Sequence, residues 1–259
     1  MMMHFQEIGA GRPVVFVHGW AMSGTAWSFQ RELADAGRLI FLDLRGHGQS
    51  APADSYTLDD YASDLVSFFD GHALTDAVLV GWSMGTQVAL HAFPALRERL
   101  AGMVLVGGNP RYASTDDYPH GKAPVEVKGM GLRLRRDRQK TMGDFFKGMF
   151  AEGELDHALY QRIVHEIVMG GRAPDSEAAL RSLDILSSAD LRERLPEVDR
   201  PVLLVHGELD TVCPASASRY MGERLPSARV EIYPGCGHAP FMSRPERFNE
   251  QLREFIAGL

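Results

Sequence analysis

Residues 77–91 read AVLVGWSMGTQVALH, and this stretch decides the fold. It opens with four apolar residues, as in a parallel strand that is buried on both faces. It closes with apolar residues at helical spacing, which continue up to Pro94. Between them lies GWSMG at 81–85, a G-x-S-x-G pattern. This context predicts a tight strand-to-helix turn with Ser83 at its tip as a nucleophile; the alternative is a glycine-rich turn with an ordinary serine.

Length, composition and charge limit the class of protein. The 259 residues allow one large α/β domain or two small ones, and a content of 45% hydrophobic and 24% charged residues is ordinary for a globular protein. A net charge of -7 argues against a nucleic-acid partner. Cys213 and Cys236 are the only cysteines, too few for a disulfide framework, and we read them as buried packing residues of a protein in a reducing compartment. With no signal-peptide pattern and no run of membrane-spanning length, we expect a cytoplasmic protein with no membrane partner.

Strands and helices alternate along the first part of the chain. Apolar runs predict strands at 13–17, 38–43, 77–80 and 102–106. Helices are predicted at 23–36, with Ser23 as its cap, and at 57–69, where Thr57 and Asp60 resemble a capping box. This rhythm predicts an α/β fold, with a mostly parallel central sheet flanked by helices.

The rhythm breaks between residues 110 and 189, where helical patterns replace strands. A helix is expected at 155–169, and its apolar face is expected to comprise Leu155, Ala158, Leu159, Ile163, Ile167 and Val168. Strands resume at 201–207 and 229–233, with helices at 215–225 and 244–256. The sequence therefore predicts a core made of residues 1–109 and 190–259, with residues 110–189 inserted as a helical lid.

Three side chains that follow strand ends form a candidate catalytic set. They are Ser83, Asp210 and His238, in that chain order. A serine needs a base to accept its proton and a third group to orient that base. His238 lies in a glycine-rich loop after the last strand, which favours it over the other histidines. Asp43 is the rival acid, but it precedes Ser83 in the chain.

Acyl transfer also needs donors for the developing oxyanion. The backbone N–H groups of Met84, which follows the nucleophile, and of Trp20, in the loop after the first long strand, are the candidates. We expect His18 to hold this loop in shape and His206 to pack locally. The rings of Trp20 and Trp82 are expected to form pocket wall or core.

Several motifs resemble the α/β-hydrolase superfamily throughout the chain. They are HGW at 18–20, DLRGHGQS at 43–50, GWSMG at 81–85, HGELDTVCP at 206–214 and GCGHAPFMSRPERF at 235–248. More narrowly, the chain resembles the pimeloyl-[acyl-carrier protein] methyl ester esterases of biotin synthesis. It departs from their pattern at Thr86, where a second glycine is usual, and in the lid at about 120–180.

The resemblance implies a serine carboxylesterase that releases pimeloyl-[acyl-carrier protein] and methanol from the methyl ester, without a cofactor or metal. It implies that Phe145 lies along the acyl chain, with Phe146 and Met149 as neighbours; lid packing is the alternative role for these three residues. The implied substrate-binding set is Trp20, Ser83, Met84, Phe145, Phe146, Met149 and His238.

The lid carries a concentration of positive charge. Residues 122–147 contain eight basic and three acidic side chains, within a chain of net charge -7. Acyl carrier proteins are acidic, so a positive patch over the active site would steer such a partner. The candidate docking residues are Arg133, Arg135, Arg136, Arg138 and Lys140. A solvated helix face is the alternative, and we expect the protein to be a monomer.

Two other functions fit the same motifs. One is a different lid-bearing hydrolase, either a broad-specificity short-chain carboxylesterase or a carbon–carbon bond hydrolase, because one triad serves all of these reactions. The other is a non-catalytic ligand receptor on this fold, against which the complete Ser-Asp-His set argues. Repeated turnover of a p-nitrophenyl ester distinguishes an enzyme from a receptor.

Overall fold

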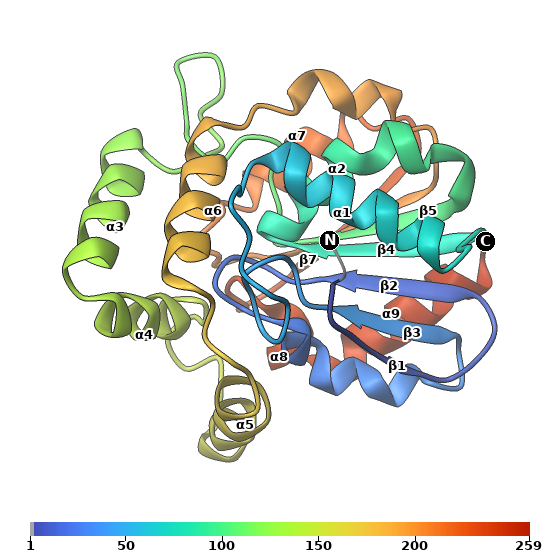
Figure 1. The fold of residues 1–259 in the computed structure, drawn as a ribbon, viewed down its shortest axis with the longest axis horizontal. Helices are drawn as coiled ribbons and strands as arrows, with labels where there is room; N and C mark the ends of the chain where they lie inside the picture. The colour runs from blue at the N-terminus through green and yellow to red at the C-terminus, as the bar shows by residue number, and fades with distance from the viewer. Residues whose placement is uncertain (1–2) are drawn as a thin grey trace.

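A single seven-stranded sheet organises the protein, and the computed structural model describes residues 3–259 (Figure 1). The strands are β1 (Phe5–Ile8), β2 (Pro13–Val17), β3 (Arg38–Leu42), β4 (Ala77–Trp82), β5 (Leu100–Val106), β6 (Val202–Gly207) and β7 (Ala228–Tyr233). Their order is β1-β3-β2-β4-β5-β6-β7, and every pair is parallel except β1 with β3. The expected mostly parallel sheet is confirmed, whereas the short edge strand β1 was not predicted, because two of its four residues are polar and exposed.

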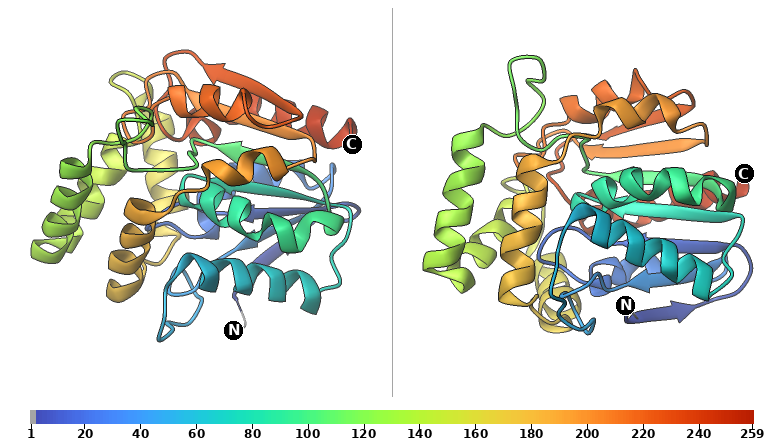
Figure 2. Two further views of the ribbon diagram at one scale, coloured as in Figure 1. Left: turned by 90° about the horizontal axis from the view of Figure 1, so that it is seen from above. Right: turned by 45° about the horizontal axis from the view of Figure 1, so that its top comes forward.

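Helices cover both faces of the sheet (Figure 2). The core helices are η1 (Gly24–Leu33), α1 (Leu58–Gly71), α2 (Met84–Leu96), η2 (Arg97–Arg99), η4 (Arg192–Glu197), α7 (Ser216–Gly222), α8 (Pro240–Ser243) and α9 (Pro245–Ala257). Because side chains alternate along a strand, β2 sends Val15 and Val17 to the face under α1 and α2, and Val14 and Phe16 to the face under η1, α8 and α9.

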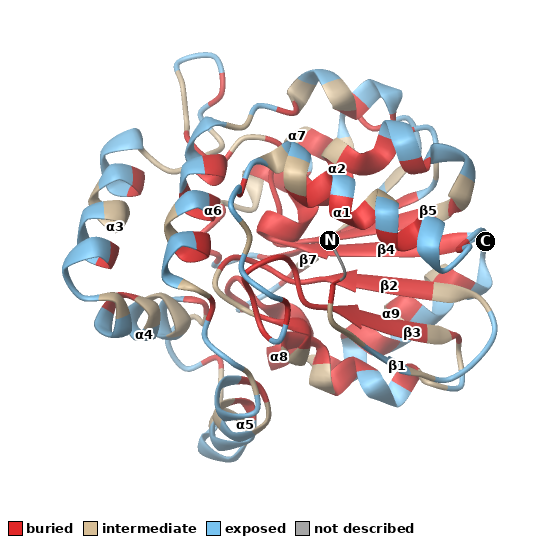
Figure 3. Cartoon of the chain, viewed as in Figure 1, coloured by how far each residue is buried: buried red, intermediate tan, exposed pale blue. Residues whose placement is uncertain are grey.

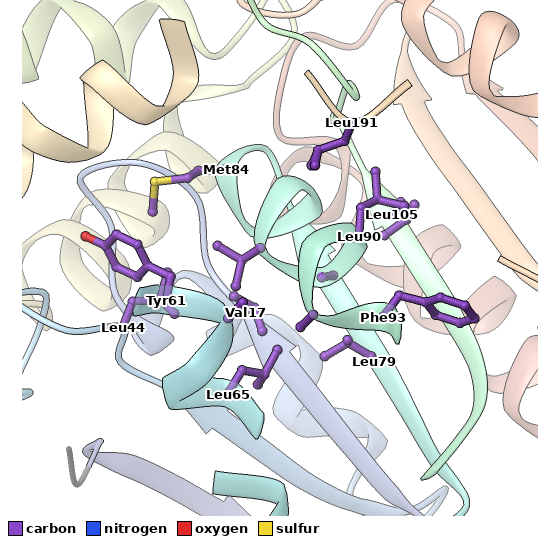
Figure 4. Packing of buried hydrophobic residues seen from close by; sticks show 14 of the residues in the cluster. Val17, Leu44, Tyr61, Leu65, Leu79, Met84, Leu90, Phe93, Leu105 and Leu191 are labelled. Atoms are coloured by element: carbon purple, nitrogen blue, oxygen red, sulfur yellow. The ribbon is translucent and has the colours of Figure 1, made fainter. Parts of the chain in front are cut away.

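The helix that follows Ser83 is among the most buried elements. Figure 3 marks most of α2 as buried, and Figure 4 shows side chains of α1, of the sheet and of Leu191 packed around it. Leu90 of α2, Leu79 of β4 and Leu105 of β5 are fully buried in this cluster. Close packing of this kind holds the N-terminus of α2, and so the turn at Ser83, in a fixed place.

Two helix starts were predicted, with different outcomes. Thr57 caps α1 in a reciprocal capping box with Asp60, as expected. The segment at 23–36 is instead a 3-10 helix, kinked at Trp27, that ends at Leu33. Ser23 does not cap it, because the Ser23 hydroxyl pairs with that of Thr25 at 2.7 Å.

The lid lies between β5 and β6 in the chain and gathers at one end of the sheet (Figure 1). Its helices are α3 (Pro124–Arg136), α4 (Arg138–Gly148), α5 (His157–Ile163), η3 (Val164–Met169) and α6 (Ser176–Ser188). Apolar side chains of the lid join the core clusters on both sides of the sheet: Leu134 and Leu183 on one side, and Ile163 and Met149, directly after α4, on the other.

The apolar face predicted for 155–169 is partly wrong. The segment begins as α5 and continues as the π-helix η3, whose wider turn rotates the later side chains away from a 3.6-residue pattern. Ile163 and Ile167 are buried as expected, but Ala158 is exposed and Val168 is 45% exposed.

Within residues 3–259, no helix has the length and apolar character needed to cross a membrane.

Candidate active site

The turn between β4 and α2 holds Ser83 in a strained conformation. Its backbone has φ 54 and ψ -115, a region that residues other than glycine rarely adopt. A Cβ on Gly81 would lie 2.5 Å from the carbonyl oxygen of Gly85, and one on Gly85 would lie 2.4 Å from that of Val17. Both glycines are therefore needed for the sharp turn that presents the serine.

Asp210, after β6, and His238, after β7, meet beneath the lid. Oδ2 of Asp210 lies 2.7 Å from Nδ1 of His238, and both side chains are fully buried. A proton on Nδ1 in this bond leaves Nε2 of His238 as an acceptor. Nε2 is buried and has no hydrogen-bond partner within residues 3–259. The imidazole is thus oriented to accept a proton on the nitrogen that faces away from Asp210.

The Asp210 carboxylate accepts hydrogen bonds at both oxygens. Oδ1 accepts from the amides of Val212 and Cys213 at 2.7 and 2.8 Å. Oδ2 also lies 3.1 Å from Nε2 of His206, whose Nδ1 lies 2.7 Å from the Ser218 hydroxyl. His206 was expected only to pack locally, but it supports the carboxylate directly. The sequence did contain a signal for this contact: His206 lies at the end of β6, four residues before Asp210.

These contacts decide the charge of Asp210. Burial by itself raises the pKa of Asp210, but the charge of His238 and hydrogen bonds from His206 and His238 outweigh that effect. The pKa of Asp210 is consequently held well below its usual value. Asp210 is therefore ionised at neutral pH and can stabilise a protonated His238.

The loop that carries Trp20 passes directly beside Ser83. A Cβ on Gly19 would lie 3.1 Å from Cβ of Ser83. His18 braces this loop: its Nδ1 lies 2.8 Å from the Gly19 carbonyl oxygen, and its Nε2 accepts the Leu44 amide at 3.0 Å. Burial lowers the pKa of His18, so it is a neutral brace, in agreement with the structural role expected for it.

Trp20 and Met84, the predicted oxyanion donors, lie in the two segments that meet at Ser83. Met84 is the first residue of α2, so its N–H has no acceptor within the helix. The Trp20 indole donates to the Ala179 carbonyl of α6 at 2.8 Å, which ties this loop to the lid. Trp82 is fully buried, and its indole donates to the His238 carbonyl at 3.0 Å.

Phe145 separates two cavities at the lid. The cavity at Ser83 has about 10 Å³ of room, enough for about one water. It is lined by Trp20, Ser83, Tyr112, Met130, Phe145, Leu183, Leu186 and Val212. Phe145 also lines a cleft of about 580 Å³, whose mostly apolar wall includes Phe146 and Met149. Of these three predicted lid residues, only Phe145 lines the cavity at Ser83, and its ring packs edge-to-face on Trp20 at 4.9 Å.

Thr86, at the position where the resemblance implied a second glycine, fits because the neighbouring backbone provides the space. Its hydroxyl donates to the Gly81 carbonyl at 3.2 Å. A Cβ on Gly108 would lie only 2.1 Å from the Thr86 hydroxyl oxygen. The glycine at 108 thus accommodates the larger side chain, and the turn at Ser83 is preserved.

The five basic residues proposed for carrier docking are not equivalent. Arg133, Arg135 and Arg136, at the end of α3, are exposed and have no ion pair with any residue from 3 to 259. Arg138 donates to the Ser176 hydroxyl and the Pro174 carbonyl, and so joins α4 to the start of α6. Lys140 pairs with Asp144 at 2.6 Å. Of these five residues, the three without an ion pair or a contact to another lid segment all lie on α3.

Comparison with known proteins agrees with this geometry. Residues 14–251 match the model of the alpha/beta hydrolase family, and the chain belongs to that family. A pimeloyl-[acyl-carrier protein] methyl ester esterase of Nitrosomonas europaea is 34% identical over 95% of this chain and 96% of its own length. The Vibrio cholerae protein of the same name is 30% identical over 98% of both chains. Among solved structures, an esterase from Exiguobacterium antarcticum superposes with a TM-score of 0.90 at 29% identity, covering 98% of this chain and 95% of that one.

Proposed function

We propose that the protein hydrolyses pimeloyl-[acyl-carrier protein] methyl ester to pimeloyl-[acyl-carrier protein] and methanol, a step of biotin synthesis. It is a carboxylic ester hydrolase of the alpha/beta hydrolase family. The similarity over nearly the whole length to several esterases of this name is the observation that carries the proposal. We place the reaction in the cytoplasm and expect a monomer to perform it.

The proposed mechanism uses Ser83, His238 and Asp210. Nε2 of His238 takes the Ser83 proton as the serine oxygen attacks the ester carbonyl. The oxyanion that develops accepts hydrogen bonds from the amides of Trp20 and Met84. The imidazolium then protonates the methoxide oxygen, and methanol leaves. Water, deprotonated by His238, then attacks the acyl-enzyme; His238 returns this proton to Ser83 as the free carboxylic acid leaves, and the acid ionises in solvent.

The acyl chain needs more room than the cavity at Ser83 provides. We propose that Phe145 turns aside when substrate binds, which would join this cavity to the cleft of about 580 Å³. Phe146 and Met149 would then line the outer part of the acyl path. In this proposal, residues 1–109 and 190–259 form the core that provides the catalytic residues. Residues 110–189 form a lid that selects the substrate.

We further propose that the exposed arginines of α3 dock the acidic carrier. Arg135→Glu combined with Arg136→Glu is expected to raise KM for the carrier-linked ester about tenfold or more. The reason is that the positive arginines attract the acidic carrier and fix its orientation on the lid. KM and kcat for a small free ester should stay unchanged, because Arg135 and Arg136 are exposed and do not line the cavity at Ser83. Arg138 is left intact in this design, since it joins α4 to α6.

A matched control carries the same charge change away from the lid. Arg31→Glu with Arg253→Glu, on η1 and α9 and therefore away from α3, removes contacts with Gln6 and Asp35 but should leave KM for the carrier-linked ester unchanged. The preference for the carrier-linked substrate should also shrink as salt is raised towards about 0.5 M. Equal losses in both double variants would contradict docking at α3.

Complementation of a biotin-requiring strain that lacks its own methyl esterase tests the function in cells. The gene for this protein should restore growth without biotin, and a Ser83→Ala version should not. Failure of the wild-type gene, with the protein present and active on a p-nitrophenyl ester, would favour a broad-specificity carboxylesterase instead.

A further inference from the structure

The loop that carries His238 is fastened to the lid by a buried carboxylate. Glu154 lies in the lid segment between α4 and α5, and only 6% of its surface is exposed. Its Oε2 accepts the Ala151 amide of its own segment at 2.6 Å and the Gly237 amide of the catalytic loop at 2.8 Å. One side chain thus connects two segments that lie more than 80 positions apart in sequence.

The backbone makes a second connection at the same place. The His238 amide donates to the carbonyl of Met149 at 2.6 Å. A Cβ on Gly237 would lie 2.4 Å from that carbonyl oxygen, so a glycine is needed for the close approach. The lid therefore accepts hydrogen bonds from two consecutive amides, and the second belongs to His238 itself.

A purely structural connection would not require a buried carboxylate such as that of Glu154. Burying a carboxylate carries a large desolvation cost unless hydrogen bonds compensate for it. Oε1 of Glu154 is buried without a hydrogen-bond partner in the described chain, residues 3–259. The Arg244 guanidinium donates to the backbone carbonyl of Glu154 at 3.2 Å, not to its carboxylate. A buried group with this cost indicates a requirement beyond packing.

We propose that Glu154 is a positioning residue for His238: when the lid is packed on the core, Glu154 holds the catalytic loop so that the His238 imidazole is correctly oriented. The inference rests on the proposed role of His238 as that base. Without the carboxylate, the Gly237 amide loses its hydrogen-bond acceptor. The His238 imidazole then loses one of the contacts that fix its position relative to Ser83. Substrate binding should be spared, because Glu154 lines neither the cavity at Ser83 nor the larger cleft.

The test is a kinetic split measured on p-nitrophenyl butyrate. Glu154→Ala is expected to lower kcat about tenfold or more with KM within about twofold, because misplacing a catalytic group slows chemistry more than binding. Glu154→Gln keeps an acceptor for the Gly237 amide and should recover most of the lost kcat. Amide hydrogen exchange of residues 234–240 should be faster in Glu154→Ala than in the wild type.

Two control variants separate positioning from stability. Glu152→Ala removes an exposed carboxylate from the same segment and should change neither kcat nor exchange at 234–240. Ile163→Ala removes a buried lid side chain that has no hydrogen bond to the His238 loop, so it should lower the Tm while kcat at 25 °C is maintained. A Glu154→Ala enzyme with a reduced Tm but a normal kcat would overturn the proposal, as would a Glu154→Gln enzyme as impaired as Glu154→Ala.

His238→Ala, measured in the same assay, separates this inference from the proposed function. An inactive His238→Ala enzyme beside a normal Glu154→Ala enzyme would overturn only the coupling. A fully active His238→Ala enzyme would remove the base on which the coupling depends. The generic ester keeps both results independent of whether the carrier-linked substrate is accepted.

Discussion

Replacing Ser83 with alanine is expected to lower kcat for ester hydrolysis by about five to six powers of ten. The loss is large because no other hydroxyl can replace a nucleophile held at the tip of this turn. Alanine keeps the Cβ and the backbone constraints of serine, so the strained conformation at φ 54 should be retained. Steady-state turnover of p-nitrophenyl butyrate by the purified variant measures the effect.

Thermal unfolding supplies the control for this variant. A Tm close to that of the wild type would show that the loss of activity is chemical, because the packing around α2 does not involve the Ser83 hydroxyl. Residual kcat within about tenfold of the wild type, well above the range found for removal of such nucleophiles, would rule out Ser83 as the nucleophile.

Asp210→Asn is expected to lower kcat by about four powers of ten. The asparagine oxygen can still accept the amides of Val212 and Cys213, so the loop should keep its shape. Its amide nitrogen would face Nδ1 of His238 and favour the tautomer with the proton on Nε2, which cannot accept a proton from Ser83. The imidazolium would also lose its buried counter-charge. The measurement is kcat on p-nitrophenyl butyrate.

His206→Gln is a useful comparison for Asp210→Asn. It removes the supporting contact at 3.1 Å but leaves the bond between Asp210 and His238. Its loss of kcat should be much smaller than that of Asp210→Asn. If the two losses were equal, the effect of Asp210→Asn would report a collapsed loop and not a lost charge.

The fold and the candidate triad were predictable because their signals are local. A buried parallel strand has an apolar run that is visible without a structure, and Ser83 and Asp210 each follow such a run. His238 follows the edge strand β7, in which apolar and charged residues alternate. The capping box at Thr57 is likewise contained in four residues. Edge strand β1 and the π-helix η3 escaped prediction because they depend on pairing and packing with distant segments.

The supporting contacts of the site could not be read from the sequence. The hydrogen bond from Gly237 to Glu154 joins two loops whose proximity only the folded lid establishes. Likewise, the contacts of Arg138 with Ser176 and Pro174, and of Lys140 with Asp144, decide which basic charges remain available to a partner. A count of charges along the chain contains neither kind of information.

Intact-protein mass spectrometry of the carrier protein tests the central claim most directly. Purified enzyme is incubated with pimeloyl-[acyl-carrier protein] methyl ester, and the carrier is weighed before and after. We predict that the carrier loses the mass of one methylene group, with one methanol released for each carrier, and that Ser83→Ala leaves the mass unchanged. An intact methyl ester, under conditions in which the same enzyme hydrolyses p-nitrophenyl butyrate, would contradict the proposed substrate.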